Sequence, residues 1–469
     1  MQQCSIKGFF AGRTVLVMGL GRFGGGADSA EFAARAGAKV IVTDLADKQQ
    51  LSESLRQLKE LTDIEFHLGE HRESDFETAD IVIVNPAVPK DNRFLKIAAR
   101  CNKVITSQIS LFFRFCPART IGVTGTNGKS TTAALTAHLL TAGAQAEGTN
   151  YSAVRLGGNI GNAPLLTVLD QIDTSDLVVL ELSSFQGEQL AEIEKGPDVA
   201  VLTNLVPNHL DRHGSFANYC AGKENIFKFQ NRNSSRPAVS IFNAEDEIGT
   251  EWFQKYKNQR GRMCLKFSPE DLPAETLKAY TLPGPANRFN LAAAVCVARY
   301  FGVTDESINK SLPYFKPLPH RLELVAERNG VRWYNDSVST TPESTIAALE
   351  AFEQPKIIIA GGYDKHLCFD QLGRHIAQKA KAAILIGQTA ETIASAINKG
   401  LATEVTENTE QKIKVGLVDS LADAVSLAND LAVPGDVVLL SPACASYDMF
   451  DNFEHRGREF IRLVKALRY

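Results

Sequence analysis

The chain has 469 residues, of which 44% are hydrophobic and 22% are charged, which is typical of a soluble globular protein. Its length favours about two to four domains, each large enough to form its own core. The net charge of -4 provides no electrostatic basis for binding nucleic acid or an anionic membrane.

The cysteines and the first residues bear on the compartment. The eight cysteines form no C-x-x-C pair, which favours reduced thiols over a disulfide framework or a zinc site. No apolar run is long enough to span a bilayer. The opening "MQQCSIKGFFAGRTVLVMG" runs into a strand without the layout of a signal peptide. We therefore expect a cytoplasmic protein with neither nucleic acid nor membrane among its partners.

The first block, up to about residue 110, alternates β-rich runs with helical stretches. Strands are predicted at "TVLVMG" (14–19), "KVIVTD" (39–44), "DIVIVNP" (80–86) and "KVIT" (103–106). A helix is predicted at "ADSAEFAARAGA" (27–38), and a polar helical stretch is predicted after "KVIVTD". This β–α–β alternation predicts a parallel sheet with helices on both faces.

A glycine loop follows the first predicted strand. The stretch "GLGRFG" places Gly19, Gly21 and Gly24 at G-x-G-x-x-G spacing, and Asp44 closes the next strand, where a ribose-binding acid is expected. The pattern suits NAD in an oxidoreductase, and it equally suits another nucleotide diphosphate held at a helix N-terminus. A glycine turn that serves only helix–strand packing is a third possibility.

A second glycine loop opens the next block. In "GVTGTNGKST" the glycines are Gly122, Gly125 and Gly128, so the stretch departs from the G-x-x-x-x-G-K-[ST] template. The physical arrangement is nevertheless a strand, a glycine turn and a helix that starts at "KSTTAALTAHLL", so backbone N–H groups face the phosphates. Lys129 can then reach the terminal phosphates, and the Ser130 hydroxyl can bind Mg²⁺.

Two further polar residues stand where predicted strands end. Glu181 closes the strand in "LVVLELSSFQ", and His209 lies just beyond "DVAVLTNL" (198–205). Because Glu181 follows a predicted ATP loop, a magnesium role is favoured over a purely structural one. The histidine could be structural. A zinc site is not expected, since no Cys or His partners stand at ligand spacing.

The third block begins after a linker. The run "PYFKPLPHRLE" (313–323) contains three prolines, and "KIIIAGG" (356–362), "AAILIGQ" (382–388) and "DVVLLSPA" (436–443) then alternate with helical stretches. We predict an α/β fold of three domains. These are a Rossmann-like N-terminal domain at 1–110, a central P-loop ATPase domain at 111–317 and a Rossmann-like C-terminal domain at 318–469.

These motifs resemble those of the Mur ligases over essentially the whole chain. The family's pattern is carried by "GTNGKST", "ELSSFQ", "TNLVPNHLDRHGSFANYCAGKENIF", "NRFNLAAA" and "PHRLE". The stretches "GLGRFG", "YNDS", "GGYDK" and "LLSPACASYDMFDNFEHRG" are similar to the branch that adds D-glutamate to UDP-N-acetylmuramoyl-L-alanine. The resemblance implies an ATP-dependent, ADP-forming ligase of peptidoglycan synthesis that acts through an acyl phosphate.

The alternatives differ in what they leave unexplained. A ligase that adds L-glutamate would share nearly every motif. A more distant alternative, an NAD-dependent oxidoreductase, leaves "GTNGKST" without a role, and a regulatory ATPase or binding module does not need "SPACASYDMFDNF". The ligase reading explains both glycine loops, because one would hold the UDP diphosphate of the substrate and the other the ATP.

The resemblance also implies site residues. ATP binding is expected at Gly125, Thr126, Asn127, Gly128, Lys129, Ser130, Thr131, Asn287, Asn290, Arg321 and Asp336. The UDP-substrate is expected at Gly19, Gly21, Arg22, Phe23, Gly24, Asp44, Asn159 and Gln186. Glutamate is expected at Thr340, Lys365, Ser446 and Phe453.

For catalysis, the resemblance implies roles for Lys129, His209 and Lys223. Two Mg²⁺ ions are expected, with Ser130, Glu181, His209 and Lys223 as ligands. Lys223 is expected to be carbamylated, because a carbamate supplies the oxygen ligand that magnesium prefers. We also expect a monomer. The sequence departs from the family pattern at Val338, where relatives carry a lysine, and after Asp44, where no basic residue follows.

Overall fold

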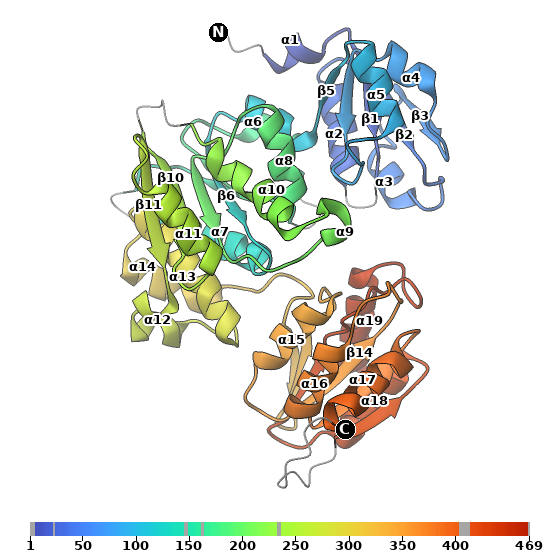
Figure 1. The fold of residues 1–469 in the computed structure, drawn as a ribbon, viewed down its shortest axis with the longest axis vertical. Helices are drawn as coiled ribbons and strands as arrows, with labels where there is room; N and C mark the ends of the chain where they lie inside the picture. Colours follow the sequence, from blue (N-terminus) through green and yellow to red (C-terminus); the bar gives the residue numbers. More distant parts are fainter. Residues whose placement is uncertain are drawn as a thin grey trace. The chain divides into compact units, whose positions relative to one another are not determined.

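The computed structural model describes residues 5–21, 24–144, 149–160, 164–231, 236–402 and 413–467 (Figure 1). The chain forms two compact units. The first comprises Met1–Thr276 and Phe289–Leu312, and the second comprises Leu277–Arg288 and Pro313–Tyr469. The first unit contains two β-sheets and the second contains one.

The N-terminal sheet has the strand order β3-β2-β1-β4-β5, and all its neighbours are parallel. Its strands are β1 (Thr14–Met18), β2 (Lys39–Asp44), β3 (Ile64–Leu68), β4 (Ile81–Val84) and β5 (Val104–Thr106), with helices α1 (Ile6–Phe10), α2 (Gly25–Arg35), α3 (Ser52–Gln57), α4 (Glu73–Thr78) and α5 (Arg93–Arg100). Val15 and Val17 of β1 pack into one core cluster, while Leu16 and Met18 pack into another. Because side chains alternate along a strand, the sheet is covered on both faces, as predicted.

One element of this domain was predicted wrongly. Strand β3 lies within the stretch predicted as a polar helix after "KVIVTD". It carries the buried residue His67, and both ring nitrogens have partners. Nδ1 lies 2.7 Å from Asp75 Oδ2, and Nε2 lies 2.9 Å from Glu65 Oε1. The strand reads Ile-Glu-Phe-His-Leu, so apolar and polar residues alternate along it, and this short strand signal was overlooked within a polar stretch.

The central sheet has the order β11-β10-β9-β6-β8-β7 and is entirely parallel. Its strands are β6 (Arg119–Thr124), β7 (Val154–Gly158), β8 (Leu177–Glu181), β9 (Val199–Leu202), β10 (Ala238–Asn243) and β11 (Arg262–Phe267). The helices of this region are α6 (Gln108–Phe115), α7 (Lys129–Gly143), α8 (Ser184–Glu192), α9 (Leu210–His213), α10 (Phe216–Lys228), α11 (Glu247–Tyr256), α12 (Ala274–Ala279), α13 (Pro285–Tyr300) and α14 (Asp305–Ser311). Short 3₁₀ turns lie at Leu169–Gln171, Pro269–Asp271 and Leu312–Tyr314.

The third sheet has the order β12-β13-β17-β14-β15-β16, and the pair β12–β13 is antiparallel. Its strands are β12 (Glu323–Arg328), β13 (Val331–Asn335), β14 (Lys356–Gly361), β15 (Ala382–Ile386), β16 (Lys414–Leu417) and β17 (Val437–Leu440). The helices are α15 (Pro342–Glu350), α16 (Asp370–Lys379), α17 (Ala390–Ala402), α18 (Leu421–Leu431) and α19 (Phe453–Ala466). Ile357 and Ile359 of β14 face one core cluster, and Ile358 and Ala360 face the other.

The α/β fold class is therefore confirmed, with one sheet in each of the three predicted blocks. The exact domain boundaries stay a prediction. In the part of the chain that the structure describes, no helix combines the length and apolar character needed to cross a membrane.

Candidate functional site

The loop between β6 and α7 has a backbone that only glycine suits. Gly125 has φ +146° and Gly128 has φ +80°, both outside the range that side chains favour. A Cβ on Gly125 would lie 1.9 Å from Thr203 Oγ1, and one on Gly128 would lie 2.2 Å from Asn290 Oδ1. Gly128 is the N-cap of α7, so the helix opens directly onto the loop at Lys129, as predicted.

The segment after β9 holds this loop in shape. Thr126 N donates to Asn204 O at 2.8 Å, and Asn127 N donates to Asn204 Oδ1 at 3.0 Å. Thr203 Oγ1 donates to Asn127 O at 2.6 Å. The Lys129 ammonium folds back and donates to Thr126 O at 2.7 Å. The loop is thus preorganised by main-chain contacts, with its lysine at the helix start.

Glu181 ends β8, the strand beside β6, and its carboxylate is buried. Asn159 Nδ2 donates to Glu181 Oε1 at 3.2 Å, and Asn159 N donates to the Glu181 carbonyl at 2.9 Å. Among the described residues, nothing hydrogen-bonds the other carboxylate oxygen, Oε2. A buried carboxylate oxygen without a partner is costly, so this atom fits a cation ligand.

Lys223 lies on α10 with only 2% of its surface exposed. Burial lowers its pKa well below the usual range, the Lys129 charge lowers it further, and Glu181 opposes the shift. Lys223 therefore shares one electrostatic environment with the loop lysine and the strand-end carboxylate. The structure thus brings together Lys129, Glu181 and Lys223, which are spread over about a hundred positions of the sequence. The lowered pKa favours the neutral form of the Lys223 amine relative to an exposed lysine.

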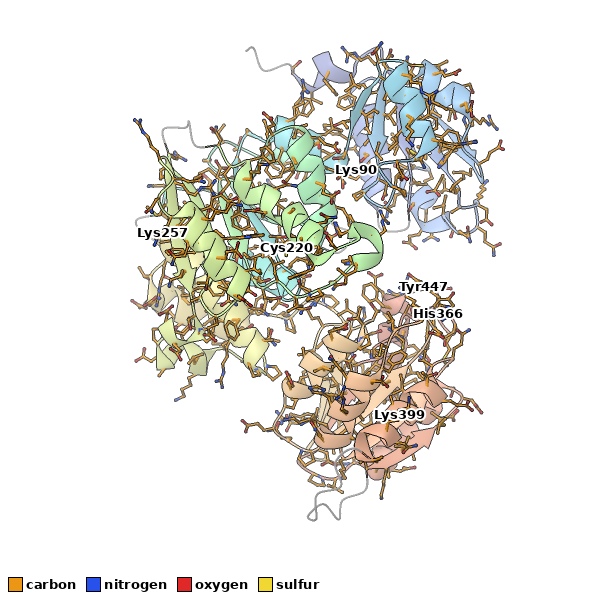
Figure 2. All side chains as sticks on the ribbon, in the orientation of Figure 1. Lys90, Cys220, Lys257, His366, Lys399 and Tyr447 are labelled. Carbon is orange, nitrogen blue, oxygen red and sulfur yellow. The ribbon has the colours of Figure 1, made fainter. Side chains whose placement is uncertain are left out.

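Tyr219 is a central residue that sequence reasoning missed. Its hydroxyl donates to Thr126 Oγ1 at 3.1 Å, and the Lys223 Nζ lies 4.7 Å from the centre of its ring. Burial raises the pKa of Tyr219 to about 12, so the phenol keeps its proton. The available signal was its position four residues before Lys223 on one helix, since residues at this spacing lie on the same face. Cys220, labelled in Figure 2, marks this helix.

His209 lies at the start of α9, where it is the N-cap residue with φ +52°. Its side chain is exposed, and its ring centre lies 6.3 Å from that of Tyr219 and 5.7 Å from that of Phe185. A left-handed conformation is unusual for a residue other than glycine or asparagine and directs the histidine off the helix. The tyrosine thus connects the predicted histidine with the ATP loop.

Asn287 and Asn290, predicted to bind ATP on the adenine side, make different contacts. Asn290 Oδ1 accepts from Thr132 Oγ1 at 3.1 Å and occupies the space next to Gly128, so this residue supports the glycine loop. Asn287 lies one turn earlier on α13, and its Nδ2 donates to Pro283 O at 2.7 Å. Their contact with an adenine ring stays a prediction.

The first glycine loop has the same kind of backbone. Gly19, Gly21 and Gly24 have φ values of +91°, +64° and +78°, and Gly24 is the N-cap of α2. The Asp44 carboxylate accepts from Gly21 N at 3.0 Å and from Ala46 N at 2.8 Å, so it shapes the loop itself. The predicted residues Arg22 and Phe23 lie outside the described residues.

Gln186, predicted near the substrate, forms a capping box at the start of α8. Its Oε1 accepts from Ser183 N at 3.0 Å, and Ser183 Oγ accepts from Gln186 N at 3.2 Å. The side-chain oxygen is therefore engaged in the helix cap, and a substrate contact would have to involve the amide nitrogen. The role of Gln186 toward substrate stays a prediction.

In the second unit, three of the residues predicted to bind the glutamate substrate follow neighbouring strands. The sheet places β17 between β13 and β14, and all three strands are parallel. The residues that follow them, Thr340, Ser446 and Lys365, therefore lie beyond the same edge of the sheet. Tyr363 N donates to Ala445 O at 2.9 Å and ties two of these segments together. Figure 2 labels Tyr447 and His366 at this edge, and the exposed Lys365 ammonium lies 5.7 Å from the Tyr447 ring centre.

Three predicted residues of this unit remain, of which Asp336 is buried and Arg321 and Phe453 are half-buried. Phe453 begins α19, and its carbonyl accepts from Ser337 Oγ at 2.7 Å. Asp336 is buried and accepts from Ser441 Oγ at 2.8 Å and from Leu322 N at 3.1 Å. Burial raises the pKa of Asp336 to about 6, although the hydrogen bonds and the Arg321 charge oppose the shift. Contacts of Arg321 and Asp336 with ATP stay predictions.

Comparison with known proteins decides the family. Three family models match: the Mur ligase MurD-like N-terminal domain at 13–107, the Mur ligase middle domain at 123–282, and the Mur ligase glutamate ligase domain at 320–444. A relative from Roseiflexus sp. (strain RS-1), named UDP-N-acetylmuramoylalanine–D-glutamate ligase, is 37% identical over 97% of this chain and 99% of its own length. The chain belongs to the Mur ligase family.

Solved structures agree with the fold of this Mur ligase. The UDP-N-acetylmuramate-alanine ligase MurC from Thermotoga maritima covers 97% of this chain and 99% of its own, with a TM-score of 0.60 and 18% identity. The MurF ligase from Thermotoga maritima, solved in complex with ADP, covers 99% and 98%, with a TM-score of 0.55 and 20% identity. At these identities the likeness concerns the fold alone.

Proposed function

We propose that this Mur ligase joins D-glutamate to the alanine carboxylate of UDP-N-acetylmuramoyl-L-alanine and converts ATP to ADP and phosphate. The reaction belongs to the synthesis of peptidoglycan precursors. The observation that carries the proposal is the cluster of Lys129, Glu181 and Lys223 at a glycine loop, in a chain related over its full length to ligases of that name.

The ATP step uses the second loop. Backbone N–H groups at the start of α7 face the phosphates, and Lys129 exchanges its bond to Thr126 O for a phosphate oxygen. The substrate carboxylate attacks the γ-phosphorus, the bond to the ADP oxygen breaks, and an acyl phosphate forms. The glutamate amine then attacks the acyl carbon, and phosphate leaves from the tetrahedral intermediate. Positioning and charge neutralisation supply most of the catalysis in phosphoryl transfer.

The residues around Glu181 fit magnesium. The unpartnered Oε2 of Glu181 and the Ser130 hydroxyl are oxygen donors, and His209 and a carbamylated Lys223 would complete the protein's part of two sites. Mg²⁺ would neutralise charge on the transferring phosphoryl group. No group of three or more His, Cys, Asp or Glu side chains suited to a metal occurs within the described ranges. Magnesium commonly takes only one or two carboxylates beside phosphate and water.

We propose that Lys223 is carbamylated, and the state of its amine supports this proposal. The neutral amine attacks CO₂, the new N–C bond forms, and one proton leaves to solvent, so that an uncharged amine becomes an anionic carbamate. The buried position and the nearby Lys129 charge favour the neutral amine that this reaction needs. The product would attract Lys129, whereas an ammonium would repel it.

The other substrates are assigned to the remaining loops. The first glycine loop and Asp44 would hold the UDP diphosphate and ribose, and Lys365 with Ser446 would hold glutamate, because a cation and a hydroxyl suit its carboxylates. We further propose that the enzyme acts as a monomer in the cytoplasm.

Formation of ADP tests the proposal. Purified protein should release ADP only when UDP-N-acetylmuramoyl-L-alanine and D-glutamate are both present. Equal turnover with L-glutamate would support the alternative stereochemistry. Tight binding of NAD(H) in calorimetry, without binding of the UDP-substrate, would instead point to the oxidoreductase.

A further inference from the structure

Asp28 is a buried carboxylate in the first turn of α2, the helix that begins at the first glycine loop. Only 6% of its surface is exposed. Its oxygens accept five hydrogen bonds, namely from Gln108 Nε2 (2.6 Å), Leu166 N (2.8 Å) and Leu165 N (3.1 Å) at Oδ2, and from Thr167 Oγ1 (2.7 Å) and Thr167 N (3.0 Å) at Oδ1. All five donors lie outside the N-terminal sheet and its helices.

Four of these hydrogen bonds come from residues 165–167 of the central domain, and the fifth comes from Gln108 near the junction of the two domains. Gln108 is the first residue of α6, and residues 165–167 follow β7 in the chain. The same connection begins with Asn159, whose amide donates to Glu181. At the other end, Asp28 N donates to Gly24 O at 2.8 Å, within the first glycine loop. The Asp28 carboxylate therefore ties the helix that begins at the first glycine loop to the connection between β7 and β8.

An apolar contact accompanies the carboxylate. Leu165 and Leu166 are buried in the same core cluster as Ala27 and Ala30 on either side of Asp28. Burying a charge next to apolar groups is costly unless hydrogen bonds satisfy it, and charge-assisted bonds from amides are strong ones. The five donors meet this requirement. The cluster thus favours a single docking position of the two domains.

Two other polar contacts between these domains lie at exposed positions. Lys90 Nζ lies 3.4 Å from Glu188 Oε2 and 3.2 Å from Glu192 Oε1, and its side chain is 59% exposed. Exposed pairs of this kind contribute little to stability and tolerate movement. Arg212 Nη2 donates to Ala87 O at 3.2 Å at an exposed position. The buried carboxylate is therefore the contact best suited to setting the geometry.

We propose that Asp28 is a positioning residue that holds the UDP-binding domain against the ATP-binding domain. The substrate is a UDP-linked acid whose nucleotide end is bound in one domain while its carboxylate must meet the γ-phosphate in the other. Fixing the two loops relative to each other would align the reacting atoms, and small displacements of reacting groups reduce rates strongly. The inference rests on the proposed ligase function.

The test compares Asp28→Asn with Asp80→Asn. Asparagine has the same shape, but its NH₂ would face backbone N–H groups that need an acceptor. We expect kcat/KM for UDP-N-acetylmuramoyl-L-alanine to fall by about 10–100-fold, while the KM for ATP changes by less than about twofold. Asp80 also accepts a backbone bond, from Thr14 N at 2.9 Å, but within the N-terminal domain, so Asp80→Asn should match the wild type.

A double mutant separates the contact from general destabilisation. Thr167→Val removes one donor to Asp28 and should lower the same kcat/KM by a smaller factor. Combined with Asp28→Asn, it should add almost nothing, because both changes remove one shared interaction. Should Asp28→Asn fail to fold, Thr167→Val and Gln108→Leu keep the carboxylate and test the same contact.

Hydrogen exchange keeps this inference separate from the proposed function. The amides of residues 165–167 should exchange faster in Asp28→Asn than in Asp80→Asn, whatever the substrates are. An inactive wild type with intact exchange protection would overturn the ligase function alone. Unchanged exchange, or equal kcat/KM for Asp28→Asn and Asp80→Asn, would overturn the role of Asp28.

Discussion

The two glycine loops use one backbone design with different side chains. Each follows a central parallel strand, contains glycines at positive φ and ends at a glycine that caps a helix. After Gly128 the helix begins with Lys129 and Ser130, whereas after Gly24 it begins with Gly25, Gly26 and Ala27. A helix N-terminus binds a diphosphate in either case. Only the second loop adds the cation and hydroxyl that phosphoryl transfer needs.

The side chains near the two loops also differ. Near the second loop lie a buried carboxylate with an unpartnered oxygen and a buried lysine of lowered pKa. At the first loop the Asp44 carboxylate is engaged by the loop's own N–H groups. This difference supports the proposal that the first loop only binds its ligand, whereas the second takes part in phosphoryl transfer.

Replacing Lys129 should have the largest effect on activity, because it removes the side chain that most clearly distinguishes the second loop from the first. Lys129→Ala removes the only cation at the start of α7, and kcat should fall by about 10²–10³-fold, a loss typical for one group that stabilises transition-state charge. Binding of UDP-N-acetylmuramoyl-L-alanine, measured by calorimetry, should be unchanged. A variant with near-normal kcat would show that the two loops do not differ in chemistry.

Replacing Lys223 should have the next largest effect. Lys223→Ala should lose about 10²-fold in kcat, since it removes the proposed oxygen ligand beside magnesium. Small carboxylic acids should restore part of the activity by taking the place of the carbamate. The exposed Lys228 on the same helix is the matched control, and Lys228→Ala should behave as the wild type.

The pH dependence of Lys223 gives a second readout. Its lowered pKa leaves more neutral amine near neutral pH than an exposed lysine would have. After removal of CO₂, reactivation at a fixed concentration of dissolved CO₂ should quicken as pH rises, because protonation of the amine blocks its attack. Reactivation that is independent of CO₂ would contradict carbamylation.

Alanine at one glycine of each loop should separate the two nucleotide sites. Gly128→Ala forces positive φ and a 2.2 Å contact with Asn290 Oδ1, while Gly21→Ala forces positive φ with a 3.3 Å contact to Asn85 Nδ2. We expect Gly128→Ala to raise the KM for ATP about tenfold and to destabilise by about 1–3 kcal/mol. Gly21→Ala should destabilise the protein less than Gly128→Ala does, and it should raise only the KM for the UDP-substrate. Equal effects of both variants on both substrates would remove the distinction.

Asp44→Asn should have the smallest effect. Asparagine keeps one acceptor for the loop but loses the charge, so the KM for the UDP-substrate should rise by only about 2–5-fold, which corresponds to the loss of about 1 kcal/mol. The KM for ATP should not change. Detection of tight NAD(H) binding to the wild type, abolished in this variant, would instead assign the first loop to a dinucleotide.

Strands and helix starts could be predicted from the sequence where a few neighbouring residues determine them. The β-rich runs at "TVLVMG", "KVIVTD" and "LVVLE" became buried parallel strands, and the Lys-Ser pair lies at the start of α7 as expected. Lys365 and Ser446 lie beyond strand ends because the predicted strands proved adjacent and parallel. Strand β3 was missed although its apolar and polar residues alternate, because the alternation covers only five residues within a polar stretch.

The sequence by itself determined the α/β class, both glycine loops and the family to which their residues belong. The tertiary structure alone decided the contacts between distant segments: Tyr219 on Thr126, Lys223 beside Lys129 and Glu181, and Asp28 under residues 165–167. Glycine turns and helix starts depend on neighbouring residues, so they can be recognised in a single sequence. Hydrogen bonds between residues 93 and 138 positions apart depend on how the sheets pack, and no local pattern encodes that packing.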